Sequence, residues 1–202
     1  LQQYVIVGTG FDSFAWRRPD LARQLRVYEV DHPDTQALKC ERVEGAGLHI
    51  PEWLRFTPAN FEKESVADAL HRVDFQPEQR THFAWHGVTY YLTREAVFDT
   101  FRALRQCASP GSVVVFDYWD AAFFAPESQN PHVREMFRNV AEVGEPFLTG
   151  FDPVSLSKEL DSCGFRIMED IGHETVQRRY FGDRTDGLAA QAIQRLAVAQ
   201  AV

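Results

Sequence analysis

The chain has 202 residues, a formal net charge of −8 and 45% hydrophobic residues. This length suits one α/β domain with a full core, and we expect a single domain over residues 1–202. The acidic balance argues against a nucleic-acid partner, which needs a basic face. No apolar stretch approaches ~18 residues, so a transmembrane helix and a membrane partner are not expected.

The cysteines and the first residues indicate the compartment. Three cysteines are scattered without metal-ligand spacing, which fits a reducing environment and predicts no metal site (Cys40, Cys107 and Cys163). The first residues resemble a buried strand and not a signal peptide. We therefore expect a cytoplasmic protein that is a monomer or a weak homo-oligomer.

A glycine turn follows the first apolar run. Residues 4–7 are apolar and mostly β-branched, and they lead into Gly8 and Gly10. Asp12 and Ser13 follow, and both are good helix N-caps. Glycines at such a turn let the backbone approach a ligand that a Cβ would exclude. The pattern predicts a strand, a tight turn and a helix that hold a nucleoside-containing cofactor.

A second predicted strand, residues 26–30, runs into Asp31 at about twenty residues past the glycine turn. An acid at this spacing usually accepts hydrogen bonds from a ribose hydroxyl pair. Glu29 lies on the same face of the strand, so strand alternation does not choose between the two carboxylates. A helix-capping role for Asp31, just before Pro33, also stays open.

Strand-like and helix-like segments alternate along the rest of the chain. This order predicts a parallel sheet with helices on both faces. Strands are expected at 54–58, 81–85, 112–117, 165–169 and 195–202, and helices at 33–44, 63–72, 94–107, 131–140 and 153–164. Residues 120–150 are the least regular and are aromatic, which is typical of a loop that supplies specificity.

Five blocks occur in an order that a known family shares. They are Val7-Gly8-Thr9-Gly10-Phe11-Asp12-Ser13, Tyr28-Glu29-Val30-Asp31-His32-Pro33, Trp85-His86-Gly87-Val88-Thr89-Tyr90-Tyr91-Leu92-Thr93, Val115-Phe116-Asp117-Tyr118 and Glu145-Pro146-Phe147. Together they resemble the leucine carboxyl methyltransferase family, and most closely its bacterial branch of S-adenosylmethionine-dependent O-methyltransferases. The resemblance implies a class I methyltransferase fold. This is a Rossmann-like three-layer sandwich whose mostly parallel seven-stranded sheet has an antiparallel last strand.

The same resemblance implies S-adenosylmethionine as the cofactor and names residues that hold it. Gly8 and Gly10 pass close to its amino-acid end and ribose, and Asp31 accepts from the ribose. Asn60 and Phe61 stand where the family has an Asp-Leu or Asp-Phe pair at the adenine. An Asn carbonyl still accepts from the adenine amino group, though without charge assistance. A turn role for Asn60 remains an alternative.

Position 86 departs further from the family pattern. His86 stands where family members usually carry Glu, near the amino-acid part of the cofactor. A histidine can still hydrogen-bond the cofactor there, so His86 is counted among the cofactor-binding residues, although it is neutral or positive and not an anionic acceptor. A role toward the acceptor, or as an ordinary surface residue, is also open. Tyr91 is the expected substrate-binding residue. Tyr90, Trp85 and Phe83 line the same pocket or belong to the core.

The leading hypothesis is O-methylation of a small-molecule carboxylate or hydroxyl, a polyketide-like metabolite being one option. A carboxylate is already an anion, so catalysis reduces to positioning and exclusion of water, and no catalytic residue is assigned. A phenol would require a base such as His86.

Three alternatives remain, and each depends on a different feature. Methylation of a protein C-terminal carboxyl group is the family's other substrate class. An NAD(P)-dependent oxidoreductase is suggested by the likeness of residues 8–13 to a dinucleotide fingerprint, although no Tyr-x-x-x-Lys pattern follows. A non-catalytic ligand-binding relative is favoured by the departures at Asn60 and His86. Family members also carry a helical segment before the first strand. Because the predicted strand stands at the first residues here, we expect this chain to lack that segment.

Overall fold

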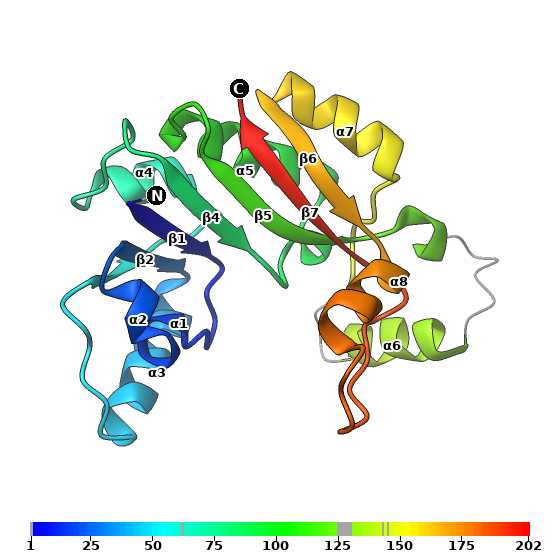
Figure 1. Ribbon diagram of the computed structural model, residues 1–202, viewed down its shortest axis with the longest axis horizontal. Coiled ribbons are helices and arrows are strands. Elements are labelled where there is room, and N and C mark those ends of the chain that lie inside the picture. The colour runs from blue at the N-terminus through cyan, green and yellow to red at the C-terminus, as the bar shows by residue number, and fades with distance from the viewer. Residues whose placement is uncertain (1, 62, 125–130, 143, 145) are drawn as a thin grey trace.

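The computed structural model describes residues 2–61, 63–124, 131–142, 144 and 146–202. Seven strands form one sheet in the order β3-β2-β1-β4-β5-β7-β6 (Figure 1). The strands are β1 (Gln3–Val7), β2 (Arg26–Asp31), β3 (Leu54–Pro58), β4 (Thr81–Trp85), β5 (Val113–Trp119), β6 (Phe165–Ile171) and β7 (Gln194–Ala201). β1 pairs in parallel with β2 and β4, while β7 is antiparallel to β5 and β6. The predicted class I methyltransferase topology, with an antiparallel last strand, is confirmed.

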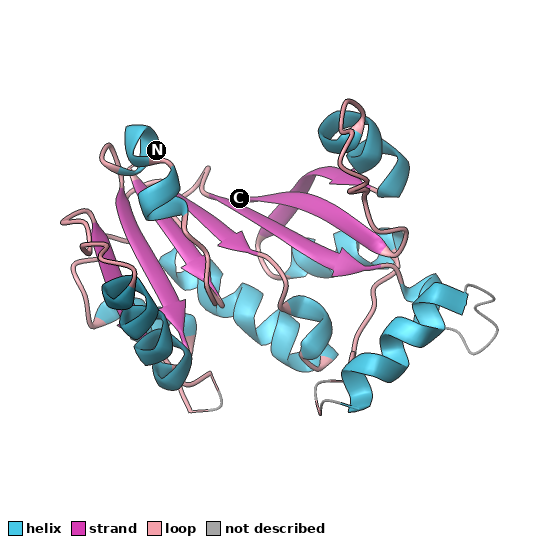
Figure 2. Ribbon diagram, turned by 90° about the horizontal axis from the view of Figure 1, so that it is seen from below, coloured by secondary structure: helices cyan, strands magenta, loops and turns pink. Residues whose placement is uncertain are grey.

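Helices lie on both sides of this sheet (Figure 2). They are α1 (Phe14–Arg17), α2 (Pro19–Ala22), α3 (Pro33–Gly45), α4 (Val66–His71), α5 (Arg94–Cys107), α6 (Pro131–Glu142), α7 (Pro153–Ser162) and α8 (His173–Val176), with short turns η1 (Thr89–Tyr91), η2 (Ala121–Phe124) and η3 (Gln177–Phe181). Among the described residues, no helix is both long and apolar enough to cross a membrane.

Strand alternation places the two largest clusters of the core on opposite faces of the sheet, and a third cluster contains Trp119, Val133 and Ile193. The larger cluster packs α4, α5 and α7 against one face and contains an aromatic contact chain. Trp85 on β4 lies 5.3 Å from Phe101 on α5, and Phe101 lies 5.0 Å from Phe116 on β5, measured between ring centroids. The smaller cluster places Ala15 and Ala22, on α1 and α2, against the opposite face. These two clusters thus fix the sheet from both sides.

The helix predicted after the glycine turn is interrupted, which corrects the sequence expectation of one continuous element. α1 has four residues and ends at Arg17, and α2 begins at Pro19. Proline has no N–H for the preceding helix, and its ring displaces the residue before it from the helical region. Arg18 accordingly has φ −126° and ψ 58°. Pro19 is the sequence signal for this break.

The start of α4 and the end of β5 also differ from the sequence expectation, as do the ends of β6 and α6. α4 begins at Val66 and not at Lys63, because Ser65 is its N-cap: the Ser65 hydroxyl accepts from Asp68 N at 3.2 Å, and Asp68 accepts from Ser65 N at 3.0 Å. β5 continues to Trp119 because β7 pairs with it along its whole length.

A buried ion pair joins β2 to α3. The Glu29 carboxylate accepts from the Lys39 ammonium, and both side chains are almost fully buried (0% and 5% exposed). Glu29 Oε1 has no hydrogen-bond partner. Burial raises the pKa of Glu29 to about 7, and the pairing with Lys39 opposes this rise. Glu29 is therefore a costly buried charge that depends on Lys39.

Replacing only Lys39 should destabilise the protein in a pH-dependent manner. We expect Lys39→Met to lower the free energy of unfolding by about 3–5 kcal/mol at pH 8, where Glu29 must either stay charged without a partner or take up a proton that the unfolded chain does not bind. An acid whose folded-state pKa is raised loses stability as the pH rises through that interval, so the loss should be smaller at pH 5. Urea unfolding at both pH values measures the difference.

The double variant Glu29→Gln/Lys39→Met is the matched control. It removes both charges, so we expect it to be more stable than Lys39→Met at pH 8 and nearly insensitive to pH at this position. Equal losses for Lys39→Met at pH 5 and pH 8 would contradict the assigned role of burial.

Candidate functional site

The residues singled out in the sequence meet along one edge of the sheet. β1 lies between β2 and β4. After β1 the chain continues to β2 on one side of the sheet, and after β4 it continues to β5 on the other side. In open α/β sheets, ligands bind at the carboxyl ends of the strands around such a switch point. Gly8 and Gly10 follow β1, Asp31 ends β2, and Asn60 and His86 come after β3 and β4.

The turn after β1 has two left-handed glycines with different surroundings. Gly8 has φ +65° and Gly10 has φ +52°, a region that favours glycine. A Cβ on Gly8 would lie 2.6 Å from Cγ2 of Val88, whereas a Cβ on Gly10 would meet nothing within 4 Å. Gly8 therefore permits close packing of this turn against the loop after β4. Gly10 has free space beside it.

Asp31 ties the glycine turn to the end of β2. Its Oδ2 accepts from Gly10 N at 2.5 Å, and its Oδ1 accepts from His32 N at 2.6 Å. The cap of α3 is His32, whose Nδ1 accepts from Asp34 N at 3.3 Å. The capping alternative for Asp31 thus gives way to a link between two strand ends. A carboxylate has about four acceptor positions, so two remain for hydroxyl donors.

The structure separates the two carboxylates that strand alternation left equivalent. Glu29 is fully buried and paired with Lys39, whereas Asp31 is partly exposed at the strand end. A ligand that arrives from solvent can therefore meet Asp31 and not Glu29.

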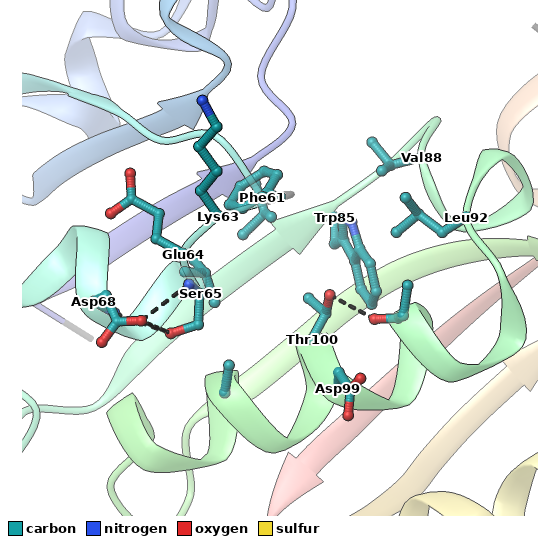
Figure 3. A pocket seen from close by; sticks show the side chains of 14 residues that line it. Phe61, Lys63, Glu64, Ser65, Asp68, Trp85, Val88, Leu92, Asp99 and Thr100 are labelled. Carbon is teal, nitrogen blue, oxygen red and sulfur yellow. Dashed lines mark hydrogen bonds between the residues drawn. The ribbon is translucent and has the colours of Figure 1, made fainter.

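Asn60 and Phe61 follow β3 beside a cavity (Figure 3). The Asn60 carbonyl accepts from the backbone N–H of Lys63 at 2.9 Å and of Glu64 at 3.0 Å, so its backbone forms the expected turn. Its side chain is half-buried, and its predicted role at an adenine stays a prediction. Phe61 is 44% exposed and forms part of the cavity wall.

The cavity has a volume of about 410 Å³ and runs from the strand ends between α4 and α5. Val7, Phe61 and Val88 line it where it meets the glycine turn. Figure 3 shows Trp85 and Leu92 on the side of β4 and α5, and Ser65 and Asp68 on the side of α4. Gly10, Asp31 and His86 are not among its lining residues, so the cavity adjoins the predicted cofactor site and does not coincide with it.

His86 is exposed just after β4, in a partly charged surrounding. Nearby protein atoms desolvate its imidazole and lower its pKa, while Asp117 and Asp12 act in the opposite direction. The side chain is therefore largely neutral at pH 7 and able to accept a proton or a hydrogen bond. Among the described residues, no group of three or more His, Cys, Asp or Glu side chains is placed to hold a metal ion.

The predicted aromatic pocket divides into core and site. Phe83 and Trp85 are fully buried in the larger core cluster. Tyr90 and Tyr91 are half-buried, and the Tyr91 ring lies 5.2 Å from that of Phe147. We call the half-buried and buried rings at the end of β5 the aromatic wall; it comprises Tyr90, Tyr91, Trp119, Phe137 and Phe147.

Two residues of this region had no assigned role in the sequence. Val88 packs against Gly8, and Asp117 at the end of β5 accepts from Gly87 N at 2.7 Å. Asp117 carries the same signal as Asp31, an acid at the end of an apolar strand. Val88 has no comparable signal, because its contact depends on how two loops meet.

Comparisons with known proteins bear on the family and the fold. The model of the family described as leucine carboxyl methyltransferase matches residues 1–105. A protein of Bacillus subtilis (strain 168), named "Putative S-adenosyl-L-methionine-dependent methyltransferase YktD", is 37% identical over 189 residues. The match covers 94% of this chain and 62% of that protein, so the chain spans less than two thirds of this relative.

Solved structures show the same fold at low sequence identity. A DUF574 family protein from Streptomyces avermitilis has a TM-score of 0.68 and 17% identity, covering all of this chain and 76% of that one. The mitomycin 7-O-methyltransferase MmcR has a TM-score of 0.63 and 13% identity, covering all of this chain and 49% of that one. With the family match over residues 1–105, these findings show that the chain belongs to the leucine carboxyl methyltransferase family and has the class I methyltransferase fold.

Proposed function

We propose that this protein binds S-adenosylmethionine at the glycine turn and transfers its methyl group to an oxygen of a small-molecule acceptor. The observation that carries the proposal is the hydrogen bond from Gly10 N to Asp31, which joins the ends of β1 and β2 beside the switch point. Free space beside Gly10 and two unused acceptor positions on Asp31 fit an adenosyl group. The relative from Bacillus subtilis is named as an S-adenosyl-L-methionine-dependent methyltransferase, which supports the choice of cofactor.

Each residue of the site has one task in this proposal. Asp31 accepts from the ribose hydroxyls as a charged acceptor, which makes strong hydrogen bonds. Asn60 and the backbone of Phe61 meet the adenine, and Gly8 and Gly10 admit the amino-acid end and the ribose. The cofactor supplies an electrophilic methyl group on a sulfonium. His86 lies beside the amino-acid end of the cofactor, and Tyr91 lies on the side of the acceptor.

The aromatic wall supports a small acceptor with an apolar body, because its rings present little that could pair with a charged chain. A carboxylate acceptor needs no base, whereas a hydroxyl acceptor can give its proton to the neutral imidazole of His86. MmcR, which shares the fold, is named as an O-methyltransferase. Oxygen as the methyl acceptor is consistent with both features.

Transfer of a labelled methyl group tests the reaction itself. We expect label from S-adenosylmethionine to appear in aromatic carboxylic acids or phenols of a test panel. Mild base releases methanol from a methyl ester and not from an ether, which identifies the acceptor group. Label found only on protein C-termini, or stabilisation by NADH and not by S-adenosylhomocysteine in a thermal-shift assay, would favour the alternatives over this proposal.

Replacing Asp31 should weaken cofactor binding specifically. We expect Asp31→Asn to raise the Kd of S-adenosylhomocysteine about 10- to 100-fold, since a hydrogen bond to a charged group contributes roughly 1.5–3 kcal/mol. Asp34→Asn is the matched control, because Asp34 loses the same charge nearby while its side chain is 95% exposed. Isothermal titration calorimetry measures both. The assignment of Asp31 fails if the two variants bind equally well.

A methyl group on Gly8 should also weaken binding of S-adenosylhomocysteine, because it would displace Val88. Gly8→Ala forces Val88 and its loop away, since the added Cβ would lie 2.6 Å from Val88 Cγ2. Gly47→Ala is the control: Gly47 has a similar φ of +68° but nothing within 4 Å of an added Cβ. Both variants should lose about 1 kcal/mol of stability from backbone strain. Only Gly8→Ala should raise the Kd of S-adenosylhomocysteine, by about 10-fold or more in calorimetry. Equal affinities in the two variants would place the ligand elsewhere.

A further inference from the structure

Asp117 joins the loop after β4 to β5 by two hydrogen bonds. Asp117 Oδ1 accepts from Gly87 N at 2.7 Å, and the Asp117 carbonyl accepts from the Thr89 hydroxyl at 2.7 Å. Gly87 and Thr89 lie between His86 and Tyr91, the two predicted site residues on this loop. The positions of His86 and Tyr91 therefore depend on Asp117.

Asp117 is itself fixed from the other side. Asp117 belongs to β5 and is only 3% exposed. Its Oδ2 accepts from Gln194 Nε2 at 2.5 Å, and Gln194 is the first residue of β7. A buried carboxylate needs such partners to remain charged. Because the residue is almost fully buried, Asp117 acts through the loop and through its field and not by touching a ligand.

The field of Asp117 reaches His86. The charged and titratable groups around His86 come from three elements: Asp117 on β5, Asp12 in the turn after β1, and His82 on β4. Both carboxylates favour the protonated imidazole, whereas desolvation disfavours it. His86 in turn lowers the pKa of the neighbouring His82. Removal of the Asp117 charge should therefore lower the pKa of His86 further.

We propose that Asp117 is a positioning residue of the cofactor site: it holds the loop that carries His86 and Tyr91, and it supplies the negative charge beside His86. This rests on the proposed function. A buried acid that served only to join β5 to β7 would leave the charge state of His86 and the affinity for the cofactor unchanged. Those two quantities separate a positioning role from a purely structural one.

Two variants test the two parts of the proposal. Asp117→Asn keeps an acceptor for Gly87 N, and Gln194 can rotate its amide to accept from the new Asn. We expect NMR titration of His86 to show a lower pKa, and calorimetry to show at least a 5-fold higher Kd for S-adenosylhomocysteine. Thr89→Val removes only the hydroxyl bond to the Asp117 carbonyl. It should raise the Kd while the pKa of His86 stays unchanged.

Asp120→Asn is the matched control. Asp120 follows the same strand, but its side chain accepts from Ala122 N at 3.0 Å and pairs with Arg195 at 3.8 Å. We expect neither readout to change in this variant. An unchanged His86 titration in Asp117→Asn, or an unchanged Kd in Thr89→Val, would overturn the proposal. Absence of S-adenosylhomocysteine binding by the unmodified protein would instead reject the proposed function, since the His86 titration does not need the ligand.

Discussion

The hydrogen bond between Gly10 N and Asp31 organises the candidate site. It exists because two conditions are met together. The glycines turn the chain back at the end of β1 with positive φ, and the parallel register places Val7 beside Val30, so that Asp31 is the next residue along. Shifting β2 by one residue would turn Asp31 to the other face of the sheet. The site thus depends on the pairing of β1 with β2 as much as on the glycines.

Three carboxylates near the strand ends differ in role because they differ in depth. Glu29 is fully enclosed, requires Lys39 and has a raised pKa of about 7. Asp31, two residues further along the same strand, reaches the edge and ties two turns together. Asp117 is buried as well, but its partners are backbone and amide donors instead of a cation. Depth and partner therefore decide which acid faces a ligand and which supports the residues around it.

The sequence was sufficient for the features that depend on local pattern. The strand at 81–85, the glycine turn, the acid at the end of the second strand and the antiparallel last strand were all predicted from alternation, turn residues or resemblance. The features that it missed depend on contacts distant in the chain. Choosing Asp31 over Glu29 requires knowing that Lys39 packs beneath β2, and the role of Asp117 requires Gln194, 77 residues away.

The loop after β4 joins the predicted cofactor site to the aromatic wall, and hydrogen bonds fix it from two segments. Asp117 holds it at Gly87 and Thr89. On the opposite side, Leu148 N donates to the Tyr90 carbonyl at 2.7 Å, and the Thr149 hydroxyl donates to the Leu92 carbonyl at 2.6 Å. The segment that holds Phe147 against Tyr91 is therefore tied to the loop that carries His86. Because interiors are close-packed, a displacement of this loop moves the aromatic wall and the residues beside the glycine turn together. Substitutions in segment 146–149 that change which methyl acceptor is used are thus expected to change the affinity for the cofactor as well.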